Sequence, residues 1–318
     1  MQVISMPMWA WILFYALVIV MLYADLKLFG RKGQHEVSIG EALKMTVVWI
    51  GVSLIFCGGI WYYEGNNKAM EFLAGYLIEK SLSMDNLFVF LMLFSFFGVQ
   101  RKYQHEVLFW GIFGALVLRS IFIFAGAAMV QKFEWVLGIF GVFLIYTGIK
   151  MFSHKDDESV DPSKNIFVKL FKKFFPVTDQ MHEDKFFIIE NGKRLATPLF
   201  IALLVIETTD VAFAVDSIPA VFSVSRDPFI VLTSNIFAIL GLRALYFALA
   251  AVAKYFKYLK YGLGIILSFV GVKMLLEVAP SPLHYEVETP TSLLIIFGVL
   301  VLSMLASYVA TLYSRKQQ

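Results

Sequence analysis

Uninterrupted apolar runs of about twenty residues recur along the whole chain, and they constrain its fold more than any other feature. An α-helix needs a run of that length to cross the hydrocarbon core of a bilayer. Hydrophobic residues make up 59% of the 318 positions and charged residues only 16%, a balance well outside that of ordinary soluble domains. A soluble protein with so many apolar runs would aggregate. The chain is therefore predicted to be an all-α polytopic membrane protein.

Hydropathy predicts nine transmembrane helices. The third and sixth predicted spans are longer than a bilayer requires, so we expect them to be tilted, kinked or partly outside the membrane. The predicted spans cover residues 8–26, 43–63, 70–98, 107–130, 134–152, 196–224, 229–252, 258–278 and 291–313.

Lysine and arginine are concentrated in alternate connections between these spans. The odd-numbered connections and the C-terminal tail are rich in both residues, whereas the even-numbered connections carry only Lys68, Lys132 and Arg226. Because loops rich in Lys and Arg stay in the cytoplasm, this pattern places the N-terminus outside and the C-terminus in the cytoplasm. No Lys or Arg precedes the first apolar run, and no small-residue cleavage pattern follows it. We interpret that run as a retained helix and not a signal peptide.

The connection at about 153–195 is the largest predicted soluble segment, and it contains two structural signals. Phe167, Leu170 and Phe174 recur at helical spacing among lysines, which predicts a short helix lying on an anionic inner leaflet. The pair Asn191-Gly192, between apolar and mixed segments, predicts a small β-hairpin.

Two stretches of the chain resemble each other. The segment 112–119 matches 236–243, and 148–151 matches 271–274 at nearly the same spacing. Upstream, Glu79 and Asp85 parallel Asp210 and Asp216. A unit of three spans must re-enter the membrane from the opposite side when it is repeated, so we predict a three-helix inverted-topology repeat, as in many transporters.

This repeat divides the chain into five parts. They are two N-terminal helices (1–69), the first repeat (70–152), a cytoplasmic loop (153–195), the second repeat (196–278), and a C-terminal helix with its tail (279–318).

Five carboxylates fall within the two long predicted spans. These are Glu79, Asp85, Glu207, Asp210 and Asp216. A charge at the bilayer centre costs about 2.5–3.5 kcal/mol on insertion scales, so these groups need compensation. Lys80, Arg119 and Arg243 supply three positive charges and leave two negative ones, which one divalent cation or two protons would balance. An alternative is that buried ion pairs only fix helix packing, so we assign Arg119 and Arg243 to structural or gating roles.

Helical geometry limits how these acids can meet. Glu207 and Asp210 lie three residues apart and share a helix face. Asp216 points to the opposite side of an ideal helix, so convergence on one ion needs a bend or an unwound turn. Pro219 offers a bend, because it cannot donate to the carbonyl of Val215. A harmless kink at Pro219 is the alternative.

The ligand chemistry favours a hard ion. Carboxylates, the amide of Asn86 and the hydroxyl of Ser217 suit Mn²⁺, Ca²⁺ or Mg²⁺. No His or Cys lies near these motifs, which argues against zinc and copper. The single cysteine, Cys57, cannot form an internal disulfide, and we interpret it as a small buried hydrophobe.

The segments 79–86 and 207–220 resemble the two signature motifs of the bacterial TerC family, and 227–243 extends the match. The whole chain is similar to the Alx branch of that family. The resemblance implies a multi-pass protein of the bacterial inner membrane that exports Mn²⁺ as its transported substrate. It also assigns the metal-binding role to the five acids.

These patterns together predict a membrane transporter that exports a hard divalent cation, with proton coupling as a hypothesis. The expected partners are the metal ion and membrane lipids, without nucleic acid. We expect no catalytic residues, because HExxH and GxSxG motifs are missing from the sequence. The alternatives are an intramembrane metal-dependent or aspartyl enzyme, and a scaffold that loads metal onto exported proteins.

Overall fold

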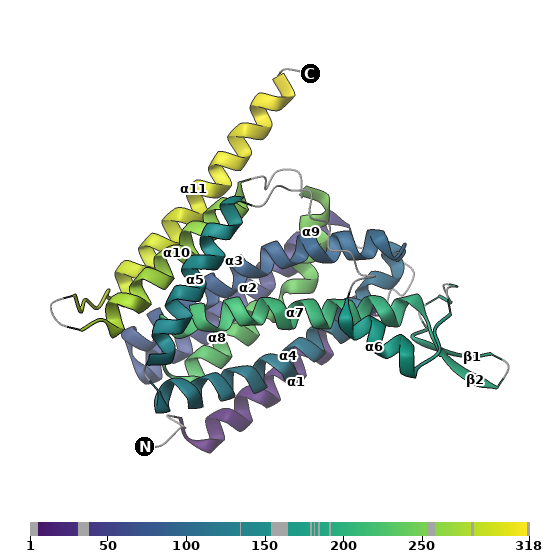
Figure 1. The fold of residues 1–318 in the computed structure, drawn as a ribbon, viewed down its shortest axis with the longest axis horizontal. Coiled ribbons are helices and arrows are strands. Elements are labelled where there is room, and N and C mark those ends of the chain that lie inside the picture. Colours follow the sequence, from purple (N-terminus) through teal and green to yellow (C-terminus); the bar gives the residue numbers. More distant parts are fainter. Residues whose placement is uncertain are drawn as a thin grey trace.

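The protein is a bundle of long helices, seen here in a computed structural model (Figure 1). The structure describes residues 6–30, 38–133, 135–153, 165–178, 180, 182–183, 185–190, 192–252, 258–280 and 283–316. The helices are α1 (Met8–Gly30), α2 (Ile39–Glu64), α3 (Asn66–Phe96), α4 (Arg101–Lys132), α5 (Trp135–Ser153), α6 (Ile166–Phe174), α7 (Pro198–Phe222), α8 (Pro228–Leu240), α9 (Leu242–Val252), α10 (Leu259–Val278) and α11 (Thr289–Lys316). The strands are β1 (Phe187–Glu190) and β2 (Lys193–Ala196).

Seven of the described helices are long and apolar enough to cross a membrane, and the bent pair α8–α9 counts as an eighth if it is one broken span and not a re-entrant loop. The seven are α1, α2, α4, α5, α7, α10 and α11. The remaining predicted span corresponds to α3, whose apolar sequence is interrupted by Glu79, Lys80 and Asp85. Its helix is nevertheless long, and it packs against α2, α7, α8 and α11. The predicted total of nine spans remains a prediction.

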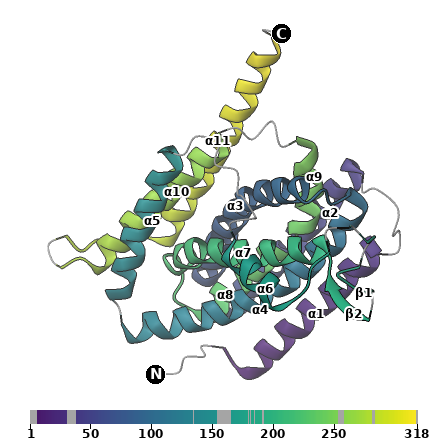
Figure 2. The ribbon, with the colours of Figure 1, turned by 45° about the vertical axis from the view of Figure 1, so that its right-hand side comes forward.

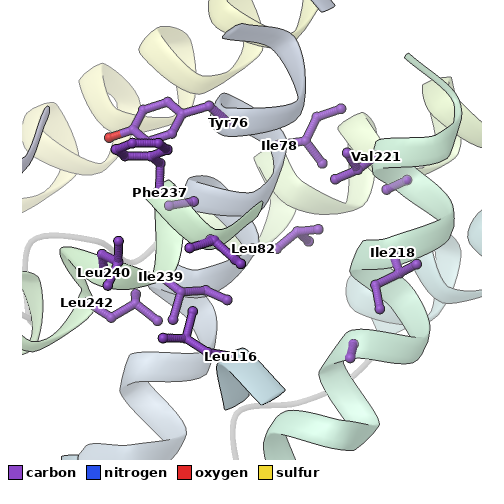
Figure 3. Close-up of a cluster of buried hydrophobic side chains, with 14 of the residues drawn as sticks. Tyr76, Ile78, Leu82, Leu116, Ile218, Val221, Phe237, Ile239, Leu240 and Leu242 are labelled. Atoms are coloured by element: carbon purple, nitrogen blue, oxygen red, sulfur yellow. The ribbon is translucent and has the colours of Figure 1, made fainter. Parts of the chain in front are cut away.

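Large apolar side chains lie on the outer surface of the helices, and charged side chains are buried in the interior. Ile55 on α2 is 77% exposed, whereas the two largest fully buried side chains are Arg119 and Arg243. Apolar side chains from α3, α4 and α8 fill the interior between the charged groups, among them Ile78, Leu116 and Ile239 (Figure 3). Exposed apolar helices around buried charges are the arrangement that a lipid environment stabilises.

The helices that the repeat relates make reciprocal contacts. In the predicted repeat, α3 corresponds to α7 and α4 corresponds to α8. α3 packs against α8, and α7 packs against α4. α10 lies between α5 and α11 and packs against both, and α11 also packs against α3 (Figure 2). At their crossing, Gly141 lies against the carbonyl of Gly271, and Gly148 lies against that of Gly264. These pairs would exchange under the predicted inverted repeat, and they run antiparallel. The repeat itself remains a prediction.

The second repeat departs from the first in its middle helix. α4 is unbroken, whereas its counterpart bends by 41° between α8 and α9. Lys80 Nζ donates a hydrogen bond to the carbonyl of Ala238 near the end of α8, at 3.0 Å. A Cβ at Gly241 would lie 2.9 Å from that ammonium. A side chain inserted at a helix break is a recognised cause of a kink.

The connection between the repeats contains both predicted elements. α6 begins after an Asn165 cap and leaves Ile166 and Phe174 exposed. β1 and β2 form an antiparallel hairpin in which Glu190 pairs with Lys193 across the turn. Gly192 in that turn has a φ of +73°, a conformation that favours glycine. Asn191 itself lies outside the described residues.

Candidate functional site

Arg119 on α4 joins two of the predicted acids in the protein interior. Its Nη2 lies 2.8 Å from Asp210 Oδ1 on α7, and its Nε lies 3.0 Å from Asp210 Oδ2. Its Nη1 donates to Glu79 on α3. Glu79 and Arg119 are each 0% exposed, and Asp210 is 4% exposed. The two acids that correspond under the repeat therefore meet at one guanidinium.

Glu79 is held by further donors. Asn235 Nδ2 on α8 lies 2.7 Å from Glu79 Oε2, and Ser83 Oγ lies 3.3 Å from Oε1. Ser217, which the sequence singled out, accepts a hydrogen bond from Arg119 Nη1 at 3.3 Å. The cluster is thus a hydrogen-bonded network whose members come from four helices.

Glu207 lies one helical turn from Asp210 on α7 and packs against α4. A Cβ added to Gly114 would lie 2.0 Å from Glu207 Oε1, so only glycine leaves room for this carboxylate. Glu207 Oε2 is buried and receives no hydrogen bond in the structure. An ionised carboxylate in this state carries a large desolvation penalty, which a proton or a cation would relieve.

Asp216 faces a different neighbour. Its Oδ1 accepts a hydrogen bond from Thr147 Oγ1 on α5 at 3.3 Å. α7 continues as one helix through Pro219 to Phe222, so no unwound turn brings Asp216 toward Asp210. Asp216 is half-buried and lies on the side of α7 that meets α5, as ideal helix geometry predicts.

Asp85 belongs to α3, but its side chain lies outside the described part of the structure. Its neighbour Asn86 is buried. Within the described residues, no group of three or more His, Cys, Asp or Glu side chains is arranged to hold a metal ion. The five predicted ligands therefore do not form a single coordination sphere in this structure.

Arg243 does not share the role of its repeat counterpart Arg119. Its Nη2 lies 3.0 Å from Asp25 Oδ2 and 2.6 Å from the carbonyl of the same residue on α1. Lys80 also differs from expectation, because its ammonium bonds to the Ala238 carbonyl. The predicted charge balance therefore needs correcting. Glu79 and Asp210 share the Arg119 guanidinium, and Glu207 has no basic partner among the described residues. These three carboxylates and one guanidinium again leave two negative charges when all are ionised.

Sequence reasoning missed three residues of this interior. Asp25 carries a signal, since it is an acid within the first apolar run. The sequence signal for Asn235 is weaker, because it is only a polar amide inside a predicted span. Gly114 has no sequence signal, because its role depends on which helix packs against it.

Apolar packing closes the cluster on one side. A cavity of about 10 Å³, the size of one water molecule, touches Asp210. Its walls are otherwise apolar and include Leu87, Ile206 and Leu242. From this side, an ion could reach Asp210 only if helices moved.

The fold and this interior define a class: a polytopic α-helical integral membrane protein with a charge network buried among its spans. The chain belongs to the TerC family of integral membrane proteins, whose family model matches residues 64–317. The match includes every predicted site residue and leaves out α1 with its Asp25.

Similar proteins occur in several bacteria. A protein of Photorhabdus laumondii, named as a candidate membrane-bound redox modulator, Alx, is 49% identical over 84% of this chain and 85% of its own. Its namesake in Escherichia coli K12 is 46% identical over 96% and 95%. A membrane protein of Myxococcus xanthus is 47% identical over 94% and 92%. No solved structure is a significant match to this chain.

Proposed function

We propose that this protein exports a hard divalent cation, with Mn²⁺ as the best candidate, across the bacterial inner membrane. One observation carries the proposal: Glu207 presents a buried carboxylate oxygen without a donor, one turn from Asp210, which already shares Arg119 with Glu79. A purely structural network would pair each carboxylate, since a lone buried charge is strongly destabilising.

The neighbouring chemistry supports a hard cation. The polar groups around Arg119 are carboxylates, the hydroxyls of Ser83 and Ser217, and the amide of Asn235. Oxygen ligands of these kinds suit Mn²⁺, Ca²⁺ and Mg²⁺. Ligand type alone does not choose among the three, and the choice of Mn²⁺ follows the family resemblance.

Arg119 gives the site a way to release its ion. A guanidinium and a divalent cation would compete for the same two carboxylates, Glu79 and Asp210. As the cation enters, Arg119 gives up a carboxylate. As the cation leaves, Arg119 or a proton neutralises the acids again. Export would then couple to proton entry, and Mn²⁺ flux that ignores an imposed pH gradient would remove this coupling.

The name redox modulator, given to the relatives, suggests a redox role as a second candidate function. Redox action by an internal disulfide is excluded, because the chain has one cysteine, Cys57. Its Sγ is 3.5 Å from the carbonyl of Ala69, where it packs between α2 and α3 as a small apolar side chain would. The buried carboxylates favour ion transport over thiol chemistry.

Mn²⁺ flux into proteoliposomes tests the proposal. We expect the intact protein to move Mn²⁺ and the near-isosteric variants Glu207→Gln and Asp210→Asn to lose most of the flux. Equal flux by all three proteins would show that these acids are not the transport site. A tight complex with an exported protein, without flux, would favour the metal-loading scaffold. Cleavage of a membrane peptide that depends on Asp85 or Asp216 would favour an enzyme.

A further inference from the structure

α8 is a short helix enclosed by protein on all sides. Every residue from Pro228 to Leu240 is buried. Its polar side chains must therefore find partners inside the protein, because lipid and water are both excluded. Thr233 Oγ1 donates to the carbonyl of Phe229 at 2.7 Å, and Ser234 Oγ donates to that of Val231 at 3.1 Å. Both hydroxyls are satisfied by the helix that carries them.

Asn235 differs from these two neighbours. Its side chain reaches out of α8, and its Nδ2 donates to Glu79 Oε2 on α3 at 2.7 Å. A carboxylate accepts hydrogen bonds, so the amide nitrogen must face Glu79 and the amide oxygen must face away. The orientation of this amide is therefore fixed by chemistry.

The amide oxygen has no donor. Asn235 is 0% exposed, and its Oδ1 receives no hydrogen bond in the structure. A buried acceptor without a partner costs about 1–3 kcal/mol, so an asparagine is an expensive choice if its only task is to donate to Glu79. A serine or threonine would donate without presenting a second buried acceptor of this strength.

The predicted first repeat carries no amide at the matching position. The aligned segments 112–119 and 236–243 place Asn235 opposite Gly111 of the first repeat. Gly111 lies on α4 and packs against Ile206 of α7. The network thus has an amide oxygen on the α8 side and an apolar contact on the α4 side.

We propose that Asn235 Oδ1 is a ligand of the transported cation, while its amide nitrogen holds Glu79 beside that ligand. Amide oxygens coordinate hard divalent ions. A neutral ligand adds affinity without adding a charge that the membrane interior must compensate. This inference rests on the proposed function, because it names a further ligand of the same site.

The test separates the ligand role from the role of holding Glu79. Asn235→Leu removes both polar atoms at similar volume. Asn235→Thr keeps a hydroxyl that can donate to Glu79 but removes the amide oxygen, without adding a charge. Thr233→Val is the matched control, since it removes a hydroxyl from an equally buried neighbour whose only partners are carbonyls of its own helix.

Mn²⁺ binding to the purified full-length protein and Mn²⁺ flux in proteoliposomes are the two readouts. We expect Asn235→Leu and Asn235→Thr to weaken Mn²⁺ binding about tenfold or more, while Thr233→Val stays near the intact protein. If Asn235→Thr binds Mn²⁺ like the intact protein while Asn235→Leu does not, the residue only holds Glu79. If Asn235→Leu binds Mn²⁺ like the intact protein, the inference is wrong. Failure of the intact protein to bind or move Mn²⁺ would overturn the proposed function itself.

Discussion

At the scale of residues, the interior is organised by which buried carboxylate pairs with which arginine. Arg119 holds Glu79 and Asp210, and Arg243 holds Asp25. The two arginines occupy matched positions in the sequence, but only Arg119 lies between the repeats. A bidentate guanidinium suits this place, because its planar fork can bond two carboxylates at once. Glu207 is left without a basic partner among the described residues.

Substituting Gly114 by alanine tests the environment of Glu207. The new Cβ would lie 2.0 Å from Oε1 and 2.4 Å from Cδ, so the carboxylate must swing away. Because the end of a side chain moves more easily than a backbone, we expect thermal stability to change little while Mn²⁺ affinity falls about tenfold. Gly58→Ala is the control, since a Cβ there meets nothing within 4 Å. Unchanged Mn²⁺ affinity in Gly114→Ala would separate Glu207 from the cation site.

At the scale of elements, the closest approach between the repeats is the crossing of α5 and α10. Gly141 and Gly271 meet backbone to backbone, and Gly148 and Gly264 do the same about two helical turns further along α5. Small residues permit such contact between membrane helices, where packing and not water exclusion drives association. The two helices can therefore pack this closely only while these positions stay small.

A valine at Gly271 should destabilise this crossing. Its Cβ would lie 2.6 Å from the carbonyl oxygen of Gly141, and a backbone atom cannot yield without moving α5. We expect a loss of stability of about 1–3 kcal/mol, seen as a lower thermal unfolding temperature in detergent. Gly298→Val on α11 meets nothing within 4 Å and serves as the control. Equal unfolding temperatures would show that the crossing is looser than the structure has it.

Sequence patterns predicted the elements better than their partners. Apolar runs located the transmembrane helices, and the pair at 191–192 located the hairpin, since both signals are local. The break at Gly241 was missed, because it depends on Lys80 reaching α8 from α3. The same limit explains the site: spacing placed Glu207 and Asp210 on one face, but the choice of Arg119 over Arg243 needed the packing of α3 against α7.

At the scale of the whole molecule, the arrangement of helices sets which loops face each compartment. The hairpin connection and the C-terminal end of α11 should share the cytoplasmic side, and the connection between α10 and α11 should lie outside. This orientation follows from the distribution of Lys and Arg and stays a prediction.

Cysteine labelling tests the orientation with little background, because Cys57→Ser removes the one native thiol. In that variant, we expect Gln180→Cys to react with an impermeant maleimide only from the cytoplasmic side. His284→Cys should react only from outside. Both positions are exposed in the structure. The opposite pattern would invert the topology, and with it the direction assigned to export.

The surplus of buried negative charge is the claim on which the account depends, and Mn²⁺ binding by Glu207→Gln tests it most directly. The substitution keeps the volume of the side chain and removes only its charge. The account predicts that the intact protein and the exposed-acid control Glu64→Gln bind one Mn²⁺ per chain with equal affinity, and that Glu207→Gln binds at least about tenfold more weakly. Equal Mn²⁺ affinity in all three proteins would contradict it.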